Sequence, residues 1–310
     1  MKKILSRLAL LLVPFILYAG FFFYFEPYDY FGLKGGTVNE DSMLVRVKEY
    51  LDHPADCILL GDSRMAHFDI DEVSRLTGKR TANLAFGGAS LNESIALFQT
   101  ALEANPDLET CYFEVSFYNL RRGDERNRTD AIKTLLKNPF AYFFNFNFNM
   151  DMLNEAQQRL RGIQTGATRD AGAWLPEDYL DANGAPLPYR ANLMTYADTI
   201  RGQCEQYQLN TENLSKLTEI AKTCAENGIR LIFVFPPVDA SITDLVIVPL
   251  DLTAPLAEIK ATLAATGAEI RDFEFVPEVI FTENQFYDGF HLDVVTGLPA
   301  YTEILFGSAD

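Results

Sequence analysis

The chain has 310 residues, 48% of them hydrophobic, which is ample material for a sizeable core. Its formal net charge is −17, and no basic run occurs outside residues 1–7. Nucleic-acid binding needs clustered cations that neutralise phosphates, so this composition excludes a polyanion-binding protein. We interpret the acidic excess as a soluble surface.

An uncharged stretch from residue 8 to residue 25 follows the basic N-terminus. Its length is close to the ~20 residues that cross a ~30 Å hydrocarbon core, and tyrosines gather at its far end as interfacial aromatic residues do. We predict a transmembrane anchor within residues 1–30. The basic flank stays in the cytoplasm, which places residues 31–310 outside. A cleaved signal peptide and a buried core helix are the alternatives.

Apolar runs alternate with helical patterns along most of the remaining chain. Predicted helices cover residues 42–51, 70–77, 91–104, 211–227 and 255–266, and predicted strands cover residues 57–60, 81–86, 110–117, 229–235 and 268–273. Strands separated by helices need crossover connections, so we predict an α/β fold with a five-stranded parallel sheet in the order 2-1-3-4-5. The strands are continuous apolar runs, which indicates a three-layer sandwich with helices on both faces.

Residues 121–209 break this alternation. They contain an Asn-Phe repeat at 145–149, a Gly-rich stretch and several prolines. A segment of this length is too long for a plain loop, so we predict an inserted subdomain with a helix around 153–161. Because the insertion follows the third strand, it either overhangs a site there or is a decoration. The organisation is thus an anchor at 1–30 and one α/β domain at 31–310.

Polar groups follow the first three predicted strands. Ser63 ends an apolar run in the sequence Gly-Asp-Ser, and Gly88 and Asn119 come after the second and third strands. Carboxyl ends of parallel strands lie at one sheet edge, where sites of such folds form. A serine hydroxyl reacts when a base takes its proton and a third group orients the base. Asp288 and His291 form the only Asp-x-x-His of the chain, so we predict that they meet Ser63.

These segments resemble, in this chain order, the SGNH or GDSL-type hydrolase superfamily. The family has four sequence blocks, and the positions that match the first, second and fourth are Gly61, Asp62, Ser63, Gly88, Asp288 and His291. The third block departs, since the family's Asn would fall where Tyr118 stands, one residue before Asn119. The resemblance covers about residues 55–120 and 205–300.

The resemblance implies a role for each matched residue. Ser63 would be the nucleophile, His291 the general base and then acid, and Asp288 the group that orients the imidazole. The amides of Ser63 and Gly88, with the side chain of Asn119, would donate to the oxyanion. We expect Asp62 to cap a helix. We expect the neighbouring Arg64 to pair with a surface carboxylate, with an anionic substrate as the alternative.

The superfamily performs acyl-ester hydrolysis or transfer. The chain is similar to its membrane-anchored extracytoplasmic members, such as the D-alanine transfer protein of teichoic-acid synthesis and the alginate O-acetylation proteins. Such members work beside a membrane-bound O-acyltransferase. The resemblance therefore implies a serine esterase or O-acyltransferase acting on an acylated cell-envelope glycan. A general small-ester esterase or lipase, and a non-catalytic scaffold of a polysaccharide-modification complex, are the alternatives.

The four cysteines are widely spaced and form no Cys-x-x-Cys or Cys/His cluster, so we expect no metal site and no cofactor. Cys57 and Cys111 lie in apolar strand-like runs and are expected to be inert core residues. Cys204 and Cys224 would pair only in an oxidising compartment, which the sequence leaves open.

Overall fold

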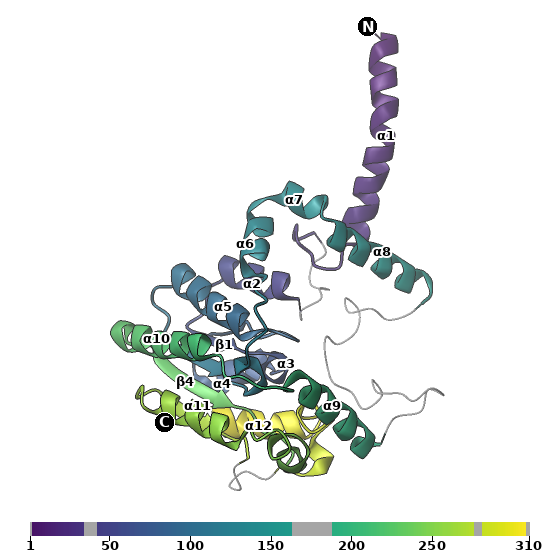
Figure 1. The fold of residues 1–310 in the computed structure, drawn as a ribbon. Coiled ribbons are helices and arrows are strands. Elements are labelled where there is room, and N and C mark those ends of the chain that lie inside the picture. Colours follow the sequence, from purple (N-terminus) through teal and green to yellow (C-terminus); the bar gives the residue numbers. More distant parts are fainter. Residues whose placement is uncertain (1, 34–41, 163–187, 276–280, 308–310) are drawn as a thin grey trace. The chain divides into compact units, whose positions relative to one another are not determined.

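The computed structural model describes residues 2–33, 42–162, 188–275 and 281–307 (Figure 1). The chain forms two compact units. The N-terminal unit comprises Met1–Lys48 and Asp130–Gly172, and the sheet unit comprises Glu49–Thr129 and Ala173–Asp310. The sequence did not predict this division, in which the first part of the insertion groups with the N-terminal helix.

The sheet unit contains five parallel strands. They are β1 (Cys57–Leu60), β2 (Thr81–Asn83), β3 (Thr110–Glu114), β4 (Arg230–Phe235) and β5 (Glu269–Asp272). Their order is β2-β1-β3-β4-β5, which confirms the predicted α/β class and strand order. In the register Leu60 pairs with Phe113 and Glu114 pairs with Val234, so β1, β3 and β4 end together. All residues of β1 and β3 are buried, as their unbroken apolar sequence requires.

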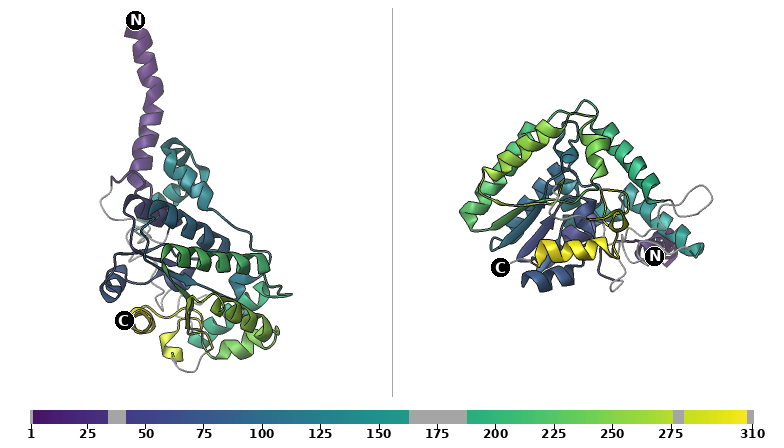
Figure 2. Two further views of the ribbon diagram at one scale, coloured as in Figure 1. Left: turned by 90° about the vertical axis from the view of Figure 1, so that its left-hand side faces the viewer. Right: turned by 90° about the horizontal axis from the view of Figure 1, so that it is seen from below.

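Helices connect these strands. They are α3 (Ser63–Ala66), α4 (Ile70–Thr77), α5 (Leu91–Ala104), α9 (Tyr189–Gln203), α10 (Thr211–Asn227), α11 (Thr253–Ala264) and α12 (Gly297–Phe306), and α2 (Met43–Asp52) lies at the boundary of the two units. Figure 2 shows α10 and α11, in green, on one side of the strands and α12, in yellow, on the other. The helix ends follow local sequence: Ser90 and Glu93 form a capping box at α5, and Gly228 takes the left-handed conformation after α10.

Sequence patterns missed α9 and α12. The α12 segment begins at Gly297 and contains Pro299, two residues that argue against a helix interior. Both fall in the first turn, where the amides need no partner within the helix and proline is tolerated. The helix then buries Leu298, Tyr301, Leu305 and Phe306 in the core that also holds residues of β1 and β4.

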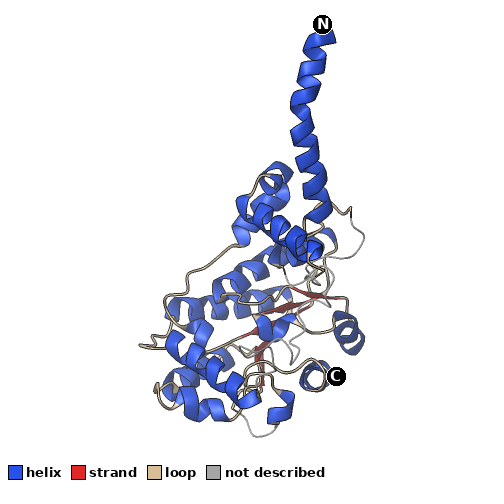
Figure 3. Ribbon diagram, turned by 90° about the vertical axis from the view of Figure 1, so that its right-hand side faces the viewer, coloured by secondary structure: helices blue, strands red, loops and turns tan. Residues whose placement is uncertain are grey.

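The N-terminal unit is helical in its described part, as the blue ribbons of Figure 3 show. It contains α1 (Lys2–Phe25), α6 (Thr129–Lys137), α7 (Pro139–Phe143) and α8 (Phe146–Leu160). The predicted helix at 153–161 is therefore longer, because Asn145 caps it by accepting from the amides of Asn147 and Phe148. Within the described residues, no helix combines the length and the apolar content that membrane crossing needs.

The four cysteines are free and buried. Cys57 and Cys111 lie on the paired strands β1 and β3, as expected for core residues. Burial raises the pKa of the Cys57 thiol to about 12, which keeps it protonated and unreactive. The Cys204–Cys224 pair, which the sequence left open, is not formed.

Candidate active site

The Gly-Asp-Ser turn joins β1 to α3 at the carboxyl edge of the sheet. Ser63 is the first residue of α3, and the Asp62 side chain caps this helix by accepting from the Arg64 amide. A Cβ atom at Gly61 would collide with the side chain of Glu114 on the neighbouring strand β3. The glycine is thus required because the turn passes directly over a buried carboxylate.

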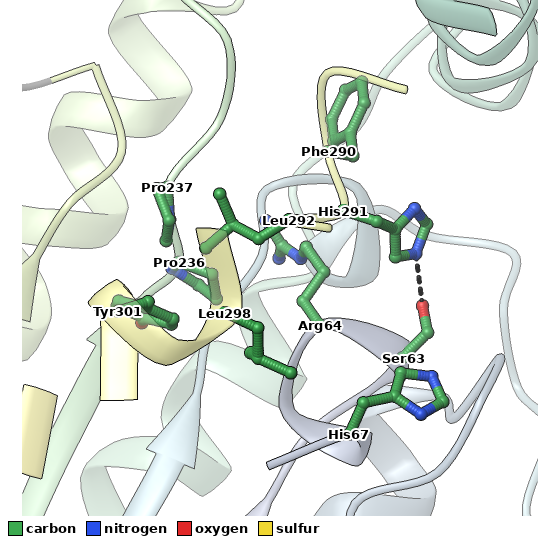
Figure 4. A pocket seen from close by; sticks show the side chains of 10 residues that line it. All are labelled: Ser63, Arg64, His67, Pro236, Pro237, Phe290, His291, Leu292, Leu298 and Tyr301. Atoms are coloured by element: carbon green, nitrogen blue, oxygen red, sulfur yellow. Dashed lines mark hydrogen bonds between the residues drawn. The ribbon is translucent and has the colours of Figure 1, made fainter. Parts of the chain in front are cut away.

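The predicted convergence of three side chains is confirmed. Ser63 Oγ lies 2.7 Å from His291 Nε2 (Figure 4), and His291 Nδ1 lies 2.8 Å from Asp288 Oδ2. These distances are hydrogen-bond distances, so the three groups form an unbroken chain. The imidazole and the carboxylate are buried, whereas the serine is only half-buried and remains open to a ligand.

Asp288 is held as an ionised acceptor. Burial alone would raise the pKa of its carboxyl, but the neighbouring His291 and hydrogen bonds to the charged form hold the pKa below the usual range. Asp288 Oδ1 accepts from the amides of Phe290 at 3.0 Å and His291 at 2.9 Å. An ionised carboxylate at Nδ1 fixes the tautomer in which Nε2 can take a proton from Ser63.

Helix α9 supplies a wall of the site that sequence reasoning missed. The ring of Tyr196 stands edge-on to the imidazole of His291, with 5.1 Å between ring centroids. Leu193, also on α9, closes over Gly289, where an added Cβ would strike its side chain. The last part of the predicted insertion therefore contacts the triad, while residues 130–172 belong to the other unit.

The three predicted oxyanion donors lie on the same edge. The Phe86 amide donates to the Gly61 carbonyl at 3.3 Å. This bond holds the segment just before Gly88 against the Gly-Asp-Ser turn. Gly88 has a φ of 68°, a conformation that favours glycine. The Asn119 side chain donates to Asp62 Oδ2 at 3.2 Å, which occupies one of its two N–H groups.

Tyr118, which stands where the family pattern places Asn, also donates a hydrogen bond to Asp62. Its hydroxyl donates to Asp62 Oδ2 at 2.7 Å and is buried. Asp62 therefore accepts from Tyr118, Asn119 and the Arg64 amide, so its role exceeds the predicted helix cap. Burial would raise the pKa of Asp62, but the Arg64 charge and the hydrogen bonds from the Arg64 amide and the Tyr118 hydroxyl hold it below its usual range.

The predicted surface pairing of Arg64 is wrong. Its side chain is buried and pairs with Glu114, with 2.6 Å between Arg64 Nη2 and Glu114 Oε1. Glu114 also accepts from the Ser116 hydroxyl at 2.8 Å and from the Asp62 amide at 2.7 Å. This ion pair anchors the backbone that carries Ser63. Glu114 lies on strand β3, fifty positions along the chain from Arg64, so a local motif cannot reveal the pair.

A small pocket opens beside the serine. Its lining consists of Ser63, Arg64, His67, Pro236, Pro237, Phe290, His291, Leu292, Leu298 and Tyr301 (Figure 4). The two prolines come directly after β4, and Leu298 and Tyr301 come from α12, so the far wall is mainly apolar.

Among the described residues, no cluster of three or more His, Cys, Asp or Glu side chains could hold a metal ion. In comparisons with known proteins, no protein-family model and no curated protein matches this chain.

Proposed function

We propose that this protein is an SGNH-like serine esterase or O-acyltransferase that forms an acyl-enzyme at Ser63. The observation that carries the proposal is the Ser63–His291–Asp288 chain, with contacts of 2.7 and 2.8 Å at the carboxyl edge of a parallel sheet. We also propose that the sheet unit is a three-layer sandwich of the SGNH kind.

The reaction would proceed in two halves. Ser63 Oγ attacks the ester carbonyl carbon while its proton passes to His291 Nε2, and the carbonyl oxygen becomes an oxyanion. The amides of Ser63 and Gly88 and the second N–H of the Asn119 side chain would donate to that oxyanion. The C–O bond then breaks, and His291 returns the proton to the leaving alcohol.

The second half releases the acyl group. Water, in hydrolysis, or a sugar hydroxyl, in transfer, loses its proton to His291 and attacks the acyl-enzyme carbonyl. The bond to Ser63 Oγ breaks, and the serine regains a proton from His291. An imidazolium forms on His291 in each half, and the buried carboxylate of Asp288 stabilises it. Asp288 itself takes up no proton and stays ionised throughout.

The substrate and location follow from the resemblance. We propose an acylated cell-envelope glycan as substrate, a membrane-bound O-acyltransferase as the partner that supplies the acyl group, and an anchor within residues 1–30. The catalytic unit would lie outside the cytoplasm. A general small-ester esterase is the second candidate, which the apolar wall of Pro236, Pro237 and Leu292 favours.

Turnover assays separate these candidates. The purified chain is assayed with an acetylated polysaccharide and with a soluble aryl acetate, alongside Ser63→Ala and a control, Ser215→Ala, at an exposed position of α10. The proposal predicts release or transfer of acetyl from the glycan by wild type and Ser215→Ala only. Preference for the aryl ester would favour the second candidate, and full activity of Ser63→Ala would refute both.

A further inference from the structure

An uncharged aromatic segment forms α7 and the start of α8. Residues 138–150 carry no charged side chain, although the chain as a whole has a net charge of −17. The segment contains six aromatic residues: Phe140, Tyr142, Phe143, Phe144, Phe146 and Phe148. Such a composition is unusual for a water-exposed part of an acidic protein, and it indicates that the segment contacts an apolar environment.

One side of this segment packs against α1, as Figure 1 shows. The Phe143 ring lies 6.0 Å from that of Phe15 and 5.0 Å from that of Tyr18, and the Tyr142 ring lies 5.7 Å from that of Phe22. The α1 helix ends at Phe25 and rises ~1.5 Å per residue, so this contact reaches about 15 Å back along the helix.

The opposite side of the segment is bare. Phe140 is 76% exposed, Phe144 61% and Phe146 76%. Over the same stretch of α1, apolar side chains that α7 does not cover are also exposed, with Leu17 at 68%. Two adjacent helical elements thus present apolar surface at the same height along α1, which favours one continuous apolar environment.

Polar backbone groups of the segment are bonded internally. The Asn138 side chain accepts from the Ala141 amide, and the Asn145 side chain accepts from the amides that open α8. Asn149 Nδ2 and the Tyr18 hydroxyl both donate to the Phe143 carbonyl at the end of α7, each at 3.0 Å. Internal bonding of this kind is required wherever water cannot reach the backbone.

We infer that α7 and the first turns of α8 are embedded in the outer leaflet of the bilayer beside α1, with Phe140, Phe144 and Phe146 in lipid. This inference rests on the proposed anchor. If the uncharged part of α1 is that anchor and its end at Phe25 lies at the outer surface of the hydrocarbon core, a contact up to about 15 Å from that end lies within the outer half of a ~30 Å core. Amphipathic elements bury their apolar side chains about 5–10 Å below the headgroups, which lies within this range.

Tryptophan scanning in vesicles tests the inference. Trp174 is the only tryptophan of the chain, so Trp174→Phe gives a silent background. Phe140→Trp and Phe144→Trp are introduced singly into the full-length chain, with Val295→Trp, 68% exposed in the sheet unit, as the control. Each protein is reconstituted into phosphatidylcholine vesicles with plain or brominated acyl chains, floated on a density gradient, and its fluorescence compared.

The inference predicts that the Phe140→Trp and Phe144→Trp proteins lose most of their fluorescence in brominated vesicles, while the Val295→Trp control keeps most of its own. Equal fluorescence of both test proteins in the two lipids would overturn the embedding and leave the anchor intact, provided the protein floats. A chain that does not float with the vesicles would overturn the anchor and this inference together. Strong quenching of the control as well would show unspecific contact and also contradict the inference.

Discussion

Buried carboxylates occur in two regions of the sheet's carboxyl edge, and the regions differ in how many hydrogen bonds these carboxylates accept. Beside β1 and β3, Asp62 and Asp288 each accept several hydrogen bonds, and their pKa values are lowered. After β5, Glu274 is only 1% exposed, and neither of its carboxylate oxygens has a hydrogen-bond partner in the described part of the chain. The comparison shows that hydrogen-bond donors can hold a buried carboxylate ionised. Glu114 is the exception on the triad side, because burial and the neighbouring Asp62 charge raise its pKa to about 7 in spite of its donors.

The pKa of Glu274 shows the effect of burial without hydrogen-bond donors. Burial raises the pKa of its carboxyl to about 7, and Lys260, whose Nζ lies 3.8 Å away, offsets this only in part. On the triad side, Asp62 and Asp288 thus keep their negative charges. The β5 edge has a group that titrates near neutral pH.

The largest expected effect tests the bonded side of the comparison. Asp288→Asn keeps the shape but removes the ionised acceptor, so the wrong imidazole tautomer faces Ser63. We expect kcat to fall on the order of 10⁴-fold. Asp293→Asn is the matched control, since Asp293 accepts amides at the start of α12 and should change stability but not kcat. Equal kcat in Asp288→Asn and wild type would contradict the assignment.

The second prediction concerns the pH dependence of stability that Glu274 causes. This carboxyl binds its proton up to about pH 7 when folded and about pH 4.5 when unfolded, so the folded state holds more protons between these values. Glu274 alone should therefore lower the free energy of unfolding by roughly 3 kcal/mol as the pH rises through this window. Glu114, with its pKa also raised to about 7 by burial, acts in the same direction.

Urea unfolding at several pH values measures this slope. Glu274→Gln should lose the share that Glu274 contributes, so its stability should fall less than that of wild type between about pH 4.5 and about pH 7. Glu226→Gln, at an exposed position of α10, is the control and should keep the wild-type slope. A wild-type slope in the Glu274→Gln protein would show that this carboxyl does not titrate in the window.

The third prediction asks whether Asn119, which donates to Asp62, also donates to the oxyanion. If its second N–H donates to the oxyanion, Asn119→Ala should lower kcat by ~100-fold or more. Tyr118→Phe, which removes only a bond to Asp62, should lower stability by about 1 kcal/mol with a smaller loss of kcat. Steady-state kinetics of the two variants compare the roles, and unchanged kcat in Asn119→Ala would remove Asn119 from the oxyanion site.

The last variant tests stability alone and concerns the turn above Glu114. Gly61→Ala forces a Cβ against that buried carboxylate, so we expect a loss of about 1–3 kcal/mol in the free energy of unfolding. Gly87→Ala, where an added Cβ meets open space, should cost much less. Equal stability of the two variants would mean that the turn relaxes and that the close approach is unimportant.

The strands and their parallel arrangement could be predicted from sequence patterns, whereas the meeting of Ser63 with His291 was predicted from the Asp-x-x-His motif and the sequence resemblance. Unbroken apolar runs mark buried strands, and parallel strands bring the residues after their carboxyl ends to one edge. The Arg64–Glu114 pair could not be predicted, because its two charges become adjacent only when β1 and β3 pair. The exposure of Ser63 and the burial of Glu274 likewise depend on packing between distant elements.

Helices α9 and α12 escaped prediction for different reasons. The α12 sequence contains helix-breaking residues that are harmless only in a first turn, and its face is set by burial in the sheet core. The α9 helix comes after a proline-rich stretch and lacks a strong apolar stripe, although it touches His291 through Tyr196. The division of the insertion between two units has no local signature at all.

Covalent labelling tests the central claim most directly. A fluorophosphonate reacts with an activated serine when the hydroxyl oxygen attacks phosphorus, fluoride leaves, and the proton passes to the base. We predict one adduct per chain, located by peptide mass spectrometry on Ser63, absent from Ser63→Ala and nearly absent from His291→Ala, but retained in Ser215→Ala. An unlabelled wild-type chain, or an adduct on a different serine, would contradict the Ser63–His291–Asp288 mechanism.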